Sequence, residues 1–530
     1  MQNESTSIVI VGGSLVGLST AMFLANRGVQ TIVLEKYIGS ALHPRAIGYT
    51  SRTMEAFKTV EIVHKLPQMD PKFRLRRIKV ESMEGKWFEE SDWTPPSKTQ
   101  DQKPQPKIEY SPYSGAAIAQ DKLEPILRER AKELGADIRQ GVEFISFEQD
   151  NEGVTVLARE RKTGNEYSIR AQYLIAADGS KSSIREALGI DRKGRGQMKT
   201  VTSVLFRAPI DHYLDSGIRQ FEIEQEGLKA FLTTYGDGRW VLMFTDDVYR
   251  TDEELTSSIY KAIGKEDLDI DIITTGRWEL SALICNKYSS GRVFLAGDSA
   301  HTLPPTRGGF GANTGIDDGF NLAWKLEAVL SGISSPRLLD TYSDERQPIG
   351  WLRHQQTFAR PDYARESQGI ADGVAVLSPE AMELGQLYRS TSVIGADEDL
   401  LPAMKPDEWA GQPGSRAQHF KVTRDGQDVS TLDLFPNGWT LLSESKDWEA
   451  AVASVSDKTG IPIEFIHIGS DVKFSDDNTF ETGFGVGPTG ASLVRPDQYV
   501  AWRSVDIPEN AEKTLAEVVN QVACPAKFNE

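Results

Sequence analysis

The sequence is short of cysteine, of histidine and of long apolar runs, and each shortage excludes a class of protein. Of its 530 residues only Cys285 and Cys524 are cysteines, and they lie far apart without a C-x-x-C spacing. A disulfide scaffold and a thiolate zinc site are therefore not expected, and a reducing compartment fits. The seven histidines show no metal-ligand spacing, so no metal site is predicted. No apolar run approaches the roughly 18 residues of a membrane span. Residues 1–7 also lack the basic start of a signal peptide. We expect a cytoplasmic protein that does not enter the membrane.

Basic residues are also too few for a protein that binds nucleic acid. Lys and Arg together number 59 against 77 Asp and Glu, which gives a net charge of −18. Because no long patch gathers the basic residues, binding to a phosphate backbone is disfavoured. Hydrophobic residues make up 39% and charged residues 26%, which is typical of a globular protein. At roughly 100–200 residues per domain, the length suggests three or four domains.

The N-terminus predicts a strand at 8–11, a glycine turn at 12–17, a helix at 18–27 and a second strand at 31–34. This order is a βαβ unit. The turn follows the G-x-G-x-x-G dinucleotide pattern except that its middle glycine is Ser14. We expect Gly12 to make the tight turn, Gly17 to let the helix pack on the strand, and the Ser14 hydroxyl to be able to donate to a phosphate. The turn residues predicted to bind the cofactor are Gly12, Ser14, Leu15, Val16 and Gly17.

An acidic residue at the end of the second strand completes the nucleotide pattern. Glu35 lies 23 residues beyond Gly12 and can accept hydrogen bonds from both hydroxyls of an adenosine ribose. The helix N-terminus at the turn suits a diphosphate. Glu35 and its neighbour Lys36 are therefore added to the predicted cofactor site. The alternative is an ordinary glycine-rich turn with an ordinary acidic strand end. A G-x-S-x-G nucleophile elbow is disfavoured, because Val16 stands where the elbow needs a small residue.

The rest of the chain predicts two further α/β passages around an alternating β segment. An amphipathic helix is expected at 121–134, and residues 200–244 alternate in the manner of a β-hairpin around the glycines at 236 and 238. Residues 93–107 predict an exposed loop. A strand at 292–296 and a helix at 313–330 follow. The glycine- and proline-containing segment 405–418 is expected to be a linker to a small C-terminal α/β domain.

Two motifs resemble those of a known family. The segment 177–185, ADGSKSSIR, resembles the DG motif, and the segment 291–301, GRVFLAGDSAH, resembles the GD motif of group A FAD-dependent aromatic hydroxylases. The resemblance continues through 313–318, 321–326 and 345–348. The segments 490–497 and 500–503 resemble the thioredoxin-like C-terminal domain of phenol hydroxylase-type and polyketide hydroxylase-type members of these flavoprotein monooxygenases, which have the p-hydroxybenzoate hydroxylase fold.

The resemblance implies an α/β architecture with a Rossmann-like FAD-binding domain, an inserted β-sheet substrate domain and a thioredoxin-like C-terminal domain. The implied FAD-binding domain is discontinuous, at 1–80, 108–195 and 280–365. The substrate-binding domain comprises 81–107 and 196–279, a helical connection spans 366–404, and the C-terminal domain spans 405–530. That last domain lacks the paired cysteines of a redox thioredoxin. We therefore expect it to be structural or a surface for association, which leaves a homodimer open.

The resemblance also implies residues that hold the cofactors FAD and NAD(P)H. Asp298 ends a buried strand and would bind ribityl hydroxyls of FAD, while the glycines after it would let the backbone lie flat beside the flavin ring. The N-terminus of the next helix would stabilise the negative charge of the reduced ring. The residues implied in this way are Arg45, Gln120, Asp178, Gly179, Gly297, Asp298, Pro305, Gly308, Gly309, Gly311, Ala312 and Asn313. NAD(P)H would bind transiently, because no second glycine fingerprint is present.

The implied reaction is a monooxygenation in which NAD(P)H reduces the flavin and a flavin C4a-hydroperoxide transfers oxygen from O₂ to a phenolic or polyketide-type aromatic substrate. No side-chain nucleophile is required, so the catalytic residue stays unassigned, with Tyr235 and His301 as candidates. The predicted substrate wall is Phe221, Phe231, Tyr235, Trp240, Phe244 and Pro304, although an ordinary sheet core would explain these aromatics as well. Baeyer–Villiger oxidation, epoxidation, oxidative dearomatisation, and a flavin dehydrogenase or reductase that does not use O₂ stay open as alternatives, as does a dinucleotide-binding protein without turnover.

Overall fold

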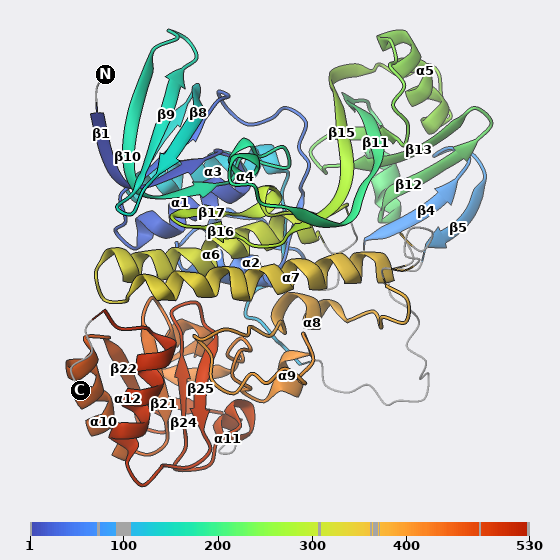
Figure 1. Cartoon of the computed structure of the whole chain (residues 1–530). Helices are drawn as coiled ribbons and strands as arrows, with labels where there is room; N and C mark the ends of the chain where they lie inside the picture. The colour runs from blue at the N-terminus through green and yellow to red at the C-terminus, as the bar shows by residue number, and fades with distance from the viewer. Residues whose placement is uncertain are drawn as a thin grey trace, which may run out of the picture.

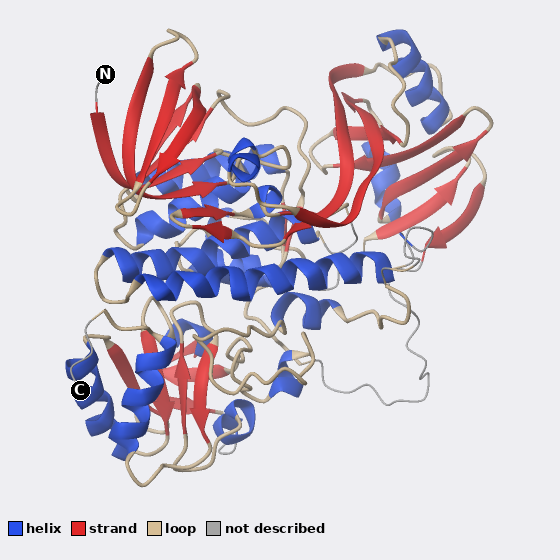
Figure 2. Ribbon diagram, in the orientation of Figure 1, coloured by secondary structure: helices blue, strands red, loops and turns tan. Residues whose placement is uncertain are grey.

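Three parts of the chain pack around one long helix. The computed structural model describes residues 3–70, 75–91, 108–305, 309–360, 363, 369, 371–475 and 479–526. Figure 1 shows two large sheets on one side of the helix α7 (Asp340–Ala359) and the C-terminal domain on its other side. Figure 2 shows that helices fill the space between the first sheet and α7. The loop predicted at 93–107 lies outside the described residues.

The first sheet has eight strands, with the path β16-β17-β10-β1-β2-β7 and with β8 and β9 attached to β10. Its centre is β1, which pairs in parallel with β10 on one side and β2 on the other. Ile8, Val9 and Ile10 are fully buried, as expected for a parallel strand covered on both faces. Because the chain runs from β1 to β2 through a helix on one side while β10 lies on the other, the carboxyl ends of β1 and β10 form a topological switch point, where such sheets bind ligands.

The elements of this first unit are as follows. The strands are β1 (Asn3–Val11), β2 (Thr31–Glu35), β7 (Asp137–Gln140), β8 (Val142–Gln149), β9 (Val154–Glu160), β10 (Glu166–Ala176), β16 (Ser289–Ser290) and β17 (Val293–Leu295). The helices are α1 (Leu15–Asn26), α2 (Ser51–Lys58), α3 (Gln120–Glu133), α4 (Ser183–Ala187) and α6 (Phe310–Leu330). Short pieces complete it: β3 (Gly48–Tyr49), β6 (Ala116–Ala117), and the 3₁₀ turns η1 (Val63–Lys65), η3 (Gly297–Ser299) and η4 (Pro336–Leu339).

The second sheet also has eight strands, in the order β18-β15-β11-β14-β13-β12-β4-β5. These are β4 (Arg76–Val80), β5 (Trp87–Ser91), β11 (Arg192–Arg207), β12 (Ile218–Gln225), β13 (Leu228–Thr234), β14 (Arg239–Phe244), β15 (Asp271–Cys285) and β18 (His301–Thr302). The strands β13 and β14 form the predicted hairpin. Strand β4 belongs to this sheet although it precedes the expected boundary at residue 80. The strands β11 and β15 run across the expected boundaries at 195 and 280, because they are long ribbons that connect the two units.

The two faces of the second sheet divide the predicted substrate wall. Phe221, Trp240 and Phe244 point to the outer face, where they are buried in a core with α5 (Asp252–Ile263). The Trp240 indole Nε1 donates to Asp211, in the 3₁₀ turn η2 (Asp211–Ser216), at 2.8 Å. The prediction that these three aromatics line a substrate site is therefore wrong, because they are the sheet's own core. Phe231 has the opposite parity and is only partly buried, with the Arg77 guanidinium over its ring.

The C-terminal domain is built on a four-stranded sheet in the order β22-β21-β24-β25, beside a three-stranded sheet β20-β19-β23. The strands are β19 (Lys421–Arg424), β20 (Gln427–Ser430), β21 (Trp439–Ser443), β22 (Ile463–His467), β23 (Val472–Phe474), β24 (Ala491–Val494) and β25 (Val500–Ser504). The helices α10 (Asp447–Thr459) and α12 (Ala511–Val522) pack on the four-stranded sheet. Before it come α8 (Pro379–Leu384) and α9 (Pro406–Trp409), and within it η6 (Thr431–Leu434) and α11 (Thr479–Phe484).

The segment 405–418 is not the exposed linker that its composition suggests. Residues 413–418 are buried, and the Gly414 N–H donates to the Val500 carbonyl while the Ala417 N–H donates to the Gln498 carbonyl. Glycine and proline therefore serve here to lay an irregular backbone closely along β25. The segment belongs to the packed body of the C-terminal domain.

Replacing one aromatic on each face of the second sheet tests this division. We expect Phe221→Ala to lower the free energy of unfolding by about 3–5 kcal/mol, because it opens a cavity in a closed core. We expect Phe231→Ala to cost roughly 1–2 kcal/mol, since that side chain is partly exposed and loses mainly its contact with Arg77. Urea unfolding measures both values, and equal losses would contradict the assignment of the faces.

Candidate functional site

The glycine turn after β1 leaves no room for side chains. Gly12 has a φ of +105°, and a Cβ there would lie 2.2 Å from the Ala177 carbonyl oxygen. A Cβ on Gly17 would lie 1.9 Å from the Gly12 carbonyl oxygen. Both positions therefore require glycine, as the sequence pattern predicts. Val16 packs against Gly297, since a Cβ on that glycine would lie 2.8 Å from a Val16 methyl group. The turn after β1 and the turn after β17 are thus pressed together.

Ser14 plays a different part from the one expected. It is the N-cap of α1, but its side chain makes no capping hydrogen bond. Its hydroxyl donates to Glu124 Oε1 at 2.6 Å and accepts from Gln120 Nε2 at 3.0 Å. The prediction that this hydroxyl donates to a phosphate is therefore not supported, because its proton is already engaged. An anion at this turn would instead meet the backbone N–H groups and the dipole at the start of α1, which Leu15 begins.

Glu35 is oriented toward the turn before any ligand binds. Its Oε2 accepts from the Gly13 N–H at 2.7 Å and its Oε1 accepts from the Tyr37 N–H at 2.8 Å. Each carboxylate oxygen keeps a further lone pair for a hydroxyl donor. Lys36 is exposed, and its ammonium lies over the Tyr37 ring, directed to that ring instead of the turn.

Gln120 connects the glycine turn to the segment that contains Arg45. Its Oε1 accepts from the backbone N–H groups of Arg45 at 3.3 Å and Ala46 at 3.4 Å, while its Nε2 bonds Ser14. The Arg45 side chain is exposed. Gln120 thus holds the backbone of Arg45 near the glycine turn, and the exposed guanidinium of Arg45 is suited to attract a transient anionic cofactor.

Asp178, in the turn after β10, carries an unused acceptor. Its Oδ2 accepts weakly from the Ile184 N–H at 3.5 Å, whereas its buried Oδ1 has no partner among the described residues. Burial raises the pKa of this carboxyl. Gly179 follows with a φ of +86° and open space beside it. Arg185 braces this turn by donating to the Ser299 carbonyl at 3.1 Å.

The turn after β17 is held from behind by a buried carboxylate. Asp318 Oδ2 accepts from the Gly297 N–H at 3.0 Å and lies 2.7 Å from His301 Nε2, and its Oδ1 accepts from Arg346 Nε at 2.8 Å. His301 is fully buried. It therefore serves to hold the turn, and its candidacy as a catalytic base is not supported because substrate has no access to it. The neighbouring charges of His301 and Arg346 lower the pKa of Asp318 against the effect of burial.

Asp298 lies on the same turn and has a different environment from Asp318. It is partly buried, and burial raises its pKa, while the electrostatic effects of His301 and Arg45 oppose that shift only in part. A desolvated carboxylate of this kind is stabilised when hydroxyl donors reach it. Because Arg45 affects the pKa of Asp298, the segment around Arg45 and the turn after β17 lie within electrostatic range of each other.

The start of α6 is fixed from the side of α2. Asn313 is buried, and its Oδ1 accepts from the Thr50 N–H at 3.0 Å and from Thr53 Oγ1 at 2.7 Å. Its Nδ2 donates to the carbonyls of Gly48 and Gly309. Gly309 has a φ of +58°, while Gly311 and Ala312 are partly exposed in the first turn, and among the described residues no atom lies near a Cβ on Gly311. The bonds of Asn313 therefore fix the start of the helix.

Three further predicted residues lie just before this helix. Pro304 is buried, and Pro305 is exposed with its carbonyl accepting from the Tyr363 hydroxyl at 2.6 Å. Gly308 lies outside the described residues.

The inner face of the second sheet meets the segment around Arg45. The Tyr235 hydroxyl donates to the Pro44 carbonyl at 2.6 Å. His43 Nε2 lies 2.7 Å from Ser203 Oγ, and its ring contacts Trp278 edge-on. These groups leave no room for a side chain on Gly276, where a Cβ would lie 2.9 Å from Ser203 Oγ. Of the predicted wall, the structure thus brings Tyr235 to the cofactor side.

Several residues beside the predicted site were not predicted, because their partners are distant in sequence. They are Glu124, His43, Ser203 and Trp278. Asp318 is part of the quoted segment 313–318, yet its bond to Arg346, 28 residues later, is visible only in the fold. A buried acid after a glycine-containing helix start was the one available signal.

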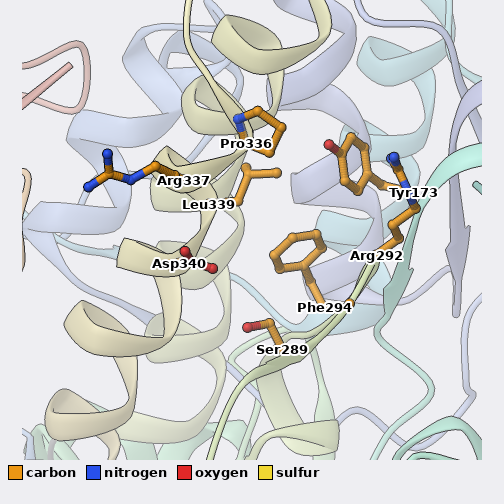
Figure 3. Close-up of a pocket in the computed structure, with 9 residues that line it drawn as sticks. Tyr173, Ser289, Arg292, Phe294, Pro336, Arg337, Leu339 and Asp340 are labelled. Carbon is orange, nitrogen blue, oxygen red and sulfur yellow. The ribbon is translucent and has the colours of Figure 1, made fainter. Parts of the chain in front are cut away.

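Neither metal ligands nor a spanning helix add to the site. Among the described residues, no group of three or more His, Cys, Asp or Glu side chains is placed to hold a metal ion. Within the same residues, no helix has both the length and the apolar character needed to cross a bilayer. A surface pocket of about 320 Å³ lies elsewhere, between β17 and η4, lined by residues such as Tyr173, Arg292 and Arg337 (Figure 3). None of its lining residues belongs to the turns described above.

The residues present fit a bound FAD molecule. The glycine turn and α1 start offer backbone donors to a diphosphate, and Glu35 can accept from the adenosine ribose. Asp178 Oδ1 is a buried acceptor without a partner in the described part of the chain, and Asp298 is desolvated, so both suit hydroxyl donors. The open start of α6 would face the flavin ring.

Comparison with known proteins points the same way. A family model described as "FAD binding domain" matches residues 5–357, and one described as "Aromatic-ring hydroxylase, C-terminal" matches residues 410–526. A 4-methyl-5-nitrocatechol 5-monooxygenase of Burkholderia sp is 34% identical, covering 98% of this chain and 97% of that protein. An aklavinone 12-hydroxylase of Streptomyces purpurascens is 36% identical, covering 98% and 99%. The crystal structure of aklavinone-11 hydroxylase with FAD and aklavinone has a TM-score of 0.86 and 33% identity, covering 99% and 100%.

Two glycines separate a packing role from a ligand role. We expect Gly311→Ala to stabilise the FAD-free protein by up to about 1 kcal/mol, because alanine is the better helix former and meets no neighbour. We expect the same change to weaken FAD binding, since the new methyl group would stand at the helix start that faces the ring. Gly17→Ala is the contrasting variant, and it should lower both the stability of the FAD-free protein and its affinity for FAD. Thermal unfolding and flavin titration measure these effects, and unchanged FAD affinity in Gly311→Ala would contradict the placement.

The buried carboxylate on the cofactor side gives FAD binding a pH dependence. Because the folded-state pKa of Asp298 is raised and hydroxyl donors bind its ionised form, FAD affinity should fall as the pH drops from neutral toward mildly acidic values. Asp298→Asn should bind FAD about tenfold more weakly at neutral pH, the effect of losing one charge-assisted hydrogen bond, and should lose most of this pH dependence. Flavin fluorescence titration checks both, and an equally steep pH profile in the variant would refute the role.

Proposed function

The chain belongs to the family of FAD-dependent aromatic-ring hydroxylases, and from that premise we propose that it hydroxylates a phenolic, polyketide-type aromatic compound. The overall reaction consumes one O₂, one NAD(P)H and one proton: one oxygen atom enters a ring C–H bond, the other leaves as water, and NAD(P)⁺ is released. The observation that supports this best is that the segment 43–45 beside the FAD site is bonded to the inner face of the second sheet, at Ser203 and Tyr235. Substrate bound on that face would lie next to the cofactor.

Bound FAD would accept hydride from NAD(P)H and activate O₂ for transfer to the ring. The residues of the chain bind the cofactors, orient the substrate and shield the site from water. Glu35 would hold the adenosine ribose and Asp298 the ribityl chain, and the exposed Arg45 would attract the anionic NAD(P)H. The start of α6 stabilises negative charge that develops on the ring, because helix N-termini favour anions.

The inner face of the sheet supplies the groups for a polar aromatic substrate. Burial lowers the pKa of His43, so its imidazole is neutral at pH 7 and can exchange a hydrogen bond with a phenol through Ser203. Burial raises the pKa of Tyr235, so its hydroxyl stays protonated and does not act as a base. Since that proton is given to Pro44, Tyr235 offers substrate only an acceptor.

The bonds between the two units also limit the access of water. Arg239, at the start of β14, pairs with Asp121, in the first turn of α3, at 2.9 Å. Together with the Tyr235–Pro44 and His43–Ser203 bonds, this pair holds the sheet against the FAD-binding unit. A closed junction favours productive oxygen transfer over release of H₂O₂.

Further parts of the proposal concern setting and assembly. A cytosolic location is supported by two buried, unpaired cysteines and by the use of NAD(P)H. Binding of aromatic compounds by the similar aklavinone-11 hydroxylase supports the substrate class. A homodimer stays a prediction, as does the choice between NADH and NADPH.

A substrate panel with isotopic oxygen tests the function. The purified protein, loaded with FAD, would be given NADH or NADPH with polycyclic hydroxyquinones, substituted catechols or no aromatic compound. The proposal expects cofactor oxidation to rise with a polycyclic phenol and one ¹⁸O from ¹⁸O₂ to appear as a new ring hydroxyl. A lactone or epoxide product would indicate the alternative oxygen insertions, and label-free product with no O₂ uptake would indicate a dehydrogenase.

Removing the Tyr235 hydroxyl tests the shielding role. In Tyr235→Phe the bond to the Pro44 carbonyl is lost, and a hydrogen bond worth about 1 kcal/mol shifts an open–closed equilibrium by roughly fivefold. We therefore expect a larger share of NAD(P)H consumption to end as H₂O₂, with FAD content unchanged. Tyr249→Phe is the matched control, because Tyr249 lies in the same unit and is exposed. If the same share of NAD(P)H consumption ends as H₂O₂ in both variants, Tyr235 has no shielding role.

A further inference from the structure

We infer that the C-terminal domain is a positioning part of the FAD site, acting through its segment 495–499, here called the 495–499 loop. The inference goes beyond the proposed function, because it assigns a task to a domain that carries neither substrate groups nor redox cysteines. Figure 1 shows this domain on the far side of α7 from the two large sheets. Its influence on the FAD site must therefore pass through buried contacts, which can be followed residue by residue.

The first route begins at the turn that holds Asp298. Asp318 fixes this turn through the Gly297 N–H and is itself held by Arg346 on α7. Arg346 Nη1 also donates to Asp317 Oδ2 at 3.1 Å, and its Nη2 donates to the Thr314 carbonyl at 3.0 Å. One guanidinium thus locks the first half of α6 against α7.

The same route reaches the C-terminal domain through α2. Arg52 Nε lies 3.5 Å from Asp317 Oδ1. Its Nη1 donates to Gln498 Oε1 at 2.9 Å and its Nη2 donates to the Asp497 carbonyl at 3.0 Å. Because Thr50 and Thr53, at the start of the same helix α2, hold Asn313 at the start of α6, a displacement of Arg52 would reach the helix N-terminus that faces the flavin.

A second route joins the 495–499 loop to the middle of α6 and α7. Arg495 donates to both oxygens of Glu345, at 2.6 and 2.9 Å, and to both oxygens of Asp497, at 3.0 and 2.6 Å. Lys325 Nζ donates to Glu345 at 2.8 Å, and Asn321 Nδ2 donates to Glu345 and to Asp497. The side chains of Arg495, Lys325 and Glu345 are fully buried.

The charges along these routes balance only when the C-terminal domain is present. Counting the Lys, Arg, Asp and Glu side chains of the network, and not His301, which bonds Asp318, five cations face five anions: Arg52, Lys325, Arg346, Arg416 and Arg495 against Glu55, Asp317, Asp318, Glu345 and Asp497. The C-terminal domain supplies Arg416, Arg495 and Asp497. Since an unpaired buried charge is strongly unfavourable, α6 and α7 depend on this loop for their arrangement.

The backbone of the loop is strained at Gln498, the residue that contacts Arg52. Gln498 has a φ of +71°, a conformation that residues other than glycine rarely adopt. Its N–H donates to the Arg495 carbonyl, and its side chain reaches Arg52. Strain of this kind persists where the surroundings hold it and the side chain has a function. Glycine would remove both the strain and the side chain, which makes position 498 a useful probe.

Two variants of the loop test the inference by FAD affinity and thermal unfolding of the FAD-free, full-length protein. In Gln498→Gly the relief of strain offsets the lost hydrogen bond, so we expect little change in Tm but a Kd for FAD at least threefold higher. In Arg495→Lys the paired bonds to Glu345 and Asp497 are lost. We expect a Kd for FAD at least tenfold higher and a shift in the absorbance of the bound flavin.

Two controls in the same domain separate positioning from general stability. Arg424→Gln removes an exposed ion pair with Glu464 and should change neither quantity. Val455→Ala opens a cavity in the domain core and should lower Tm with FAD affinity unchanged. If Gln498→Gly binds FAD within twofold of the parent, or if Val455→Ala weakens FAD binding as much as Arg495→Lys does, the inference is overturned. Failure of the parent to bind FAD would instead contradict the family assignment.

Discussion

The buried carboxylate of Asp318 is the interaction on which the rest of the site depends. It joins the Gly297 N–H, His301 and Arg346 at a single point behind the turn that carries Asp298. A buried carboxylate is stable only when most of its acceptor sites are used, and these three partners use most of those of Asp318. Because those donors come from a strand end, a 3₁₀ turn and α7, the bond fixes the relative position of the elements that surround the cofactor.

The part of the fold that follows local rules could be predicted from the sequence. The first βαβ unit, the glycine requirement at Gly12 and Gly17, and the helix after the second glycine loop all depend on short-range sterics and patterning. The nature of the segment 405–418 could not be predicted, because glycine and proline mark irregular backbone without saying whether it is buried. Ser14 lies in the glycine turn, yet its partner Glu124 is 110 residues away, and no local pattern reveals which acceptor takes its proton.

The substrate side shows where period-two patterning stops being informative. Alternation correctly separates Phe231 from Trp240, but it does not say which face of the sheet meets the cofactor. That is decided by α5, which covers one face, and by the Tyr235–Pro44 and His43–Ser203 bonds on the other. In this chain Phe221, Trp240 and Phe244 belong to the sheet's own core, whereas Ser203, Tyr235 and Trp278 lie on the face that meets the segment around Arg45.

A crystal structure of the protein grown with FAD would show whether the turn held by Asp318 positions the cofactor. We predict one extended FAD with its adenosine ribose at Glu35, its diphosphate at the start of α1 and its ribityl chain at Asp298. We also predict that the Gly297 N–H stays bonded to Asp318. FAD bound elsewhere, for instance in the surface pocket between β17 and η4, or a turn released from Asp318 in the complex, would contradict this prediction.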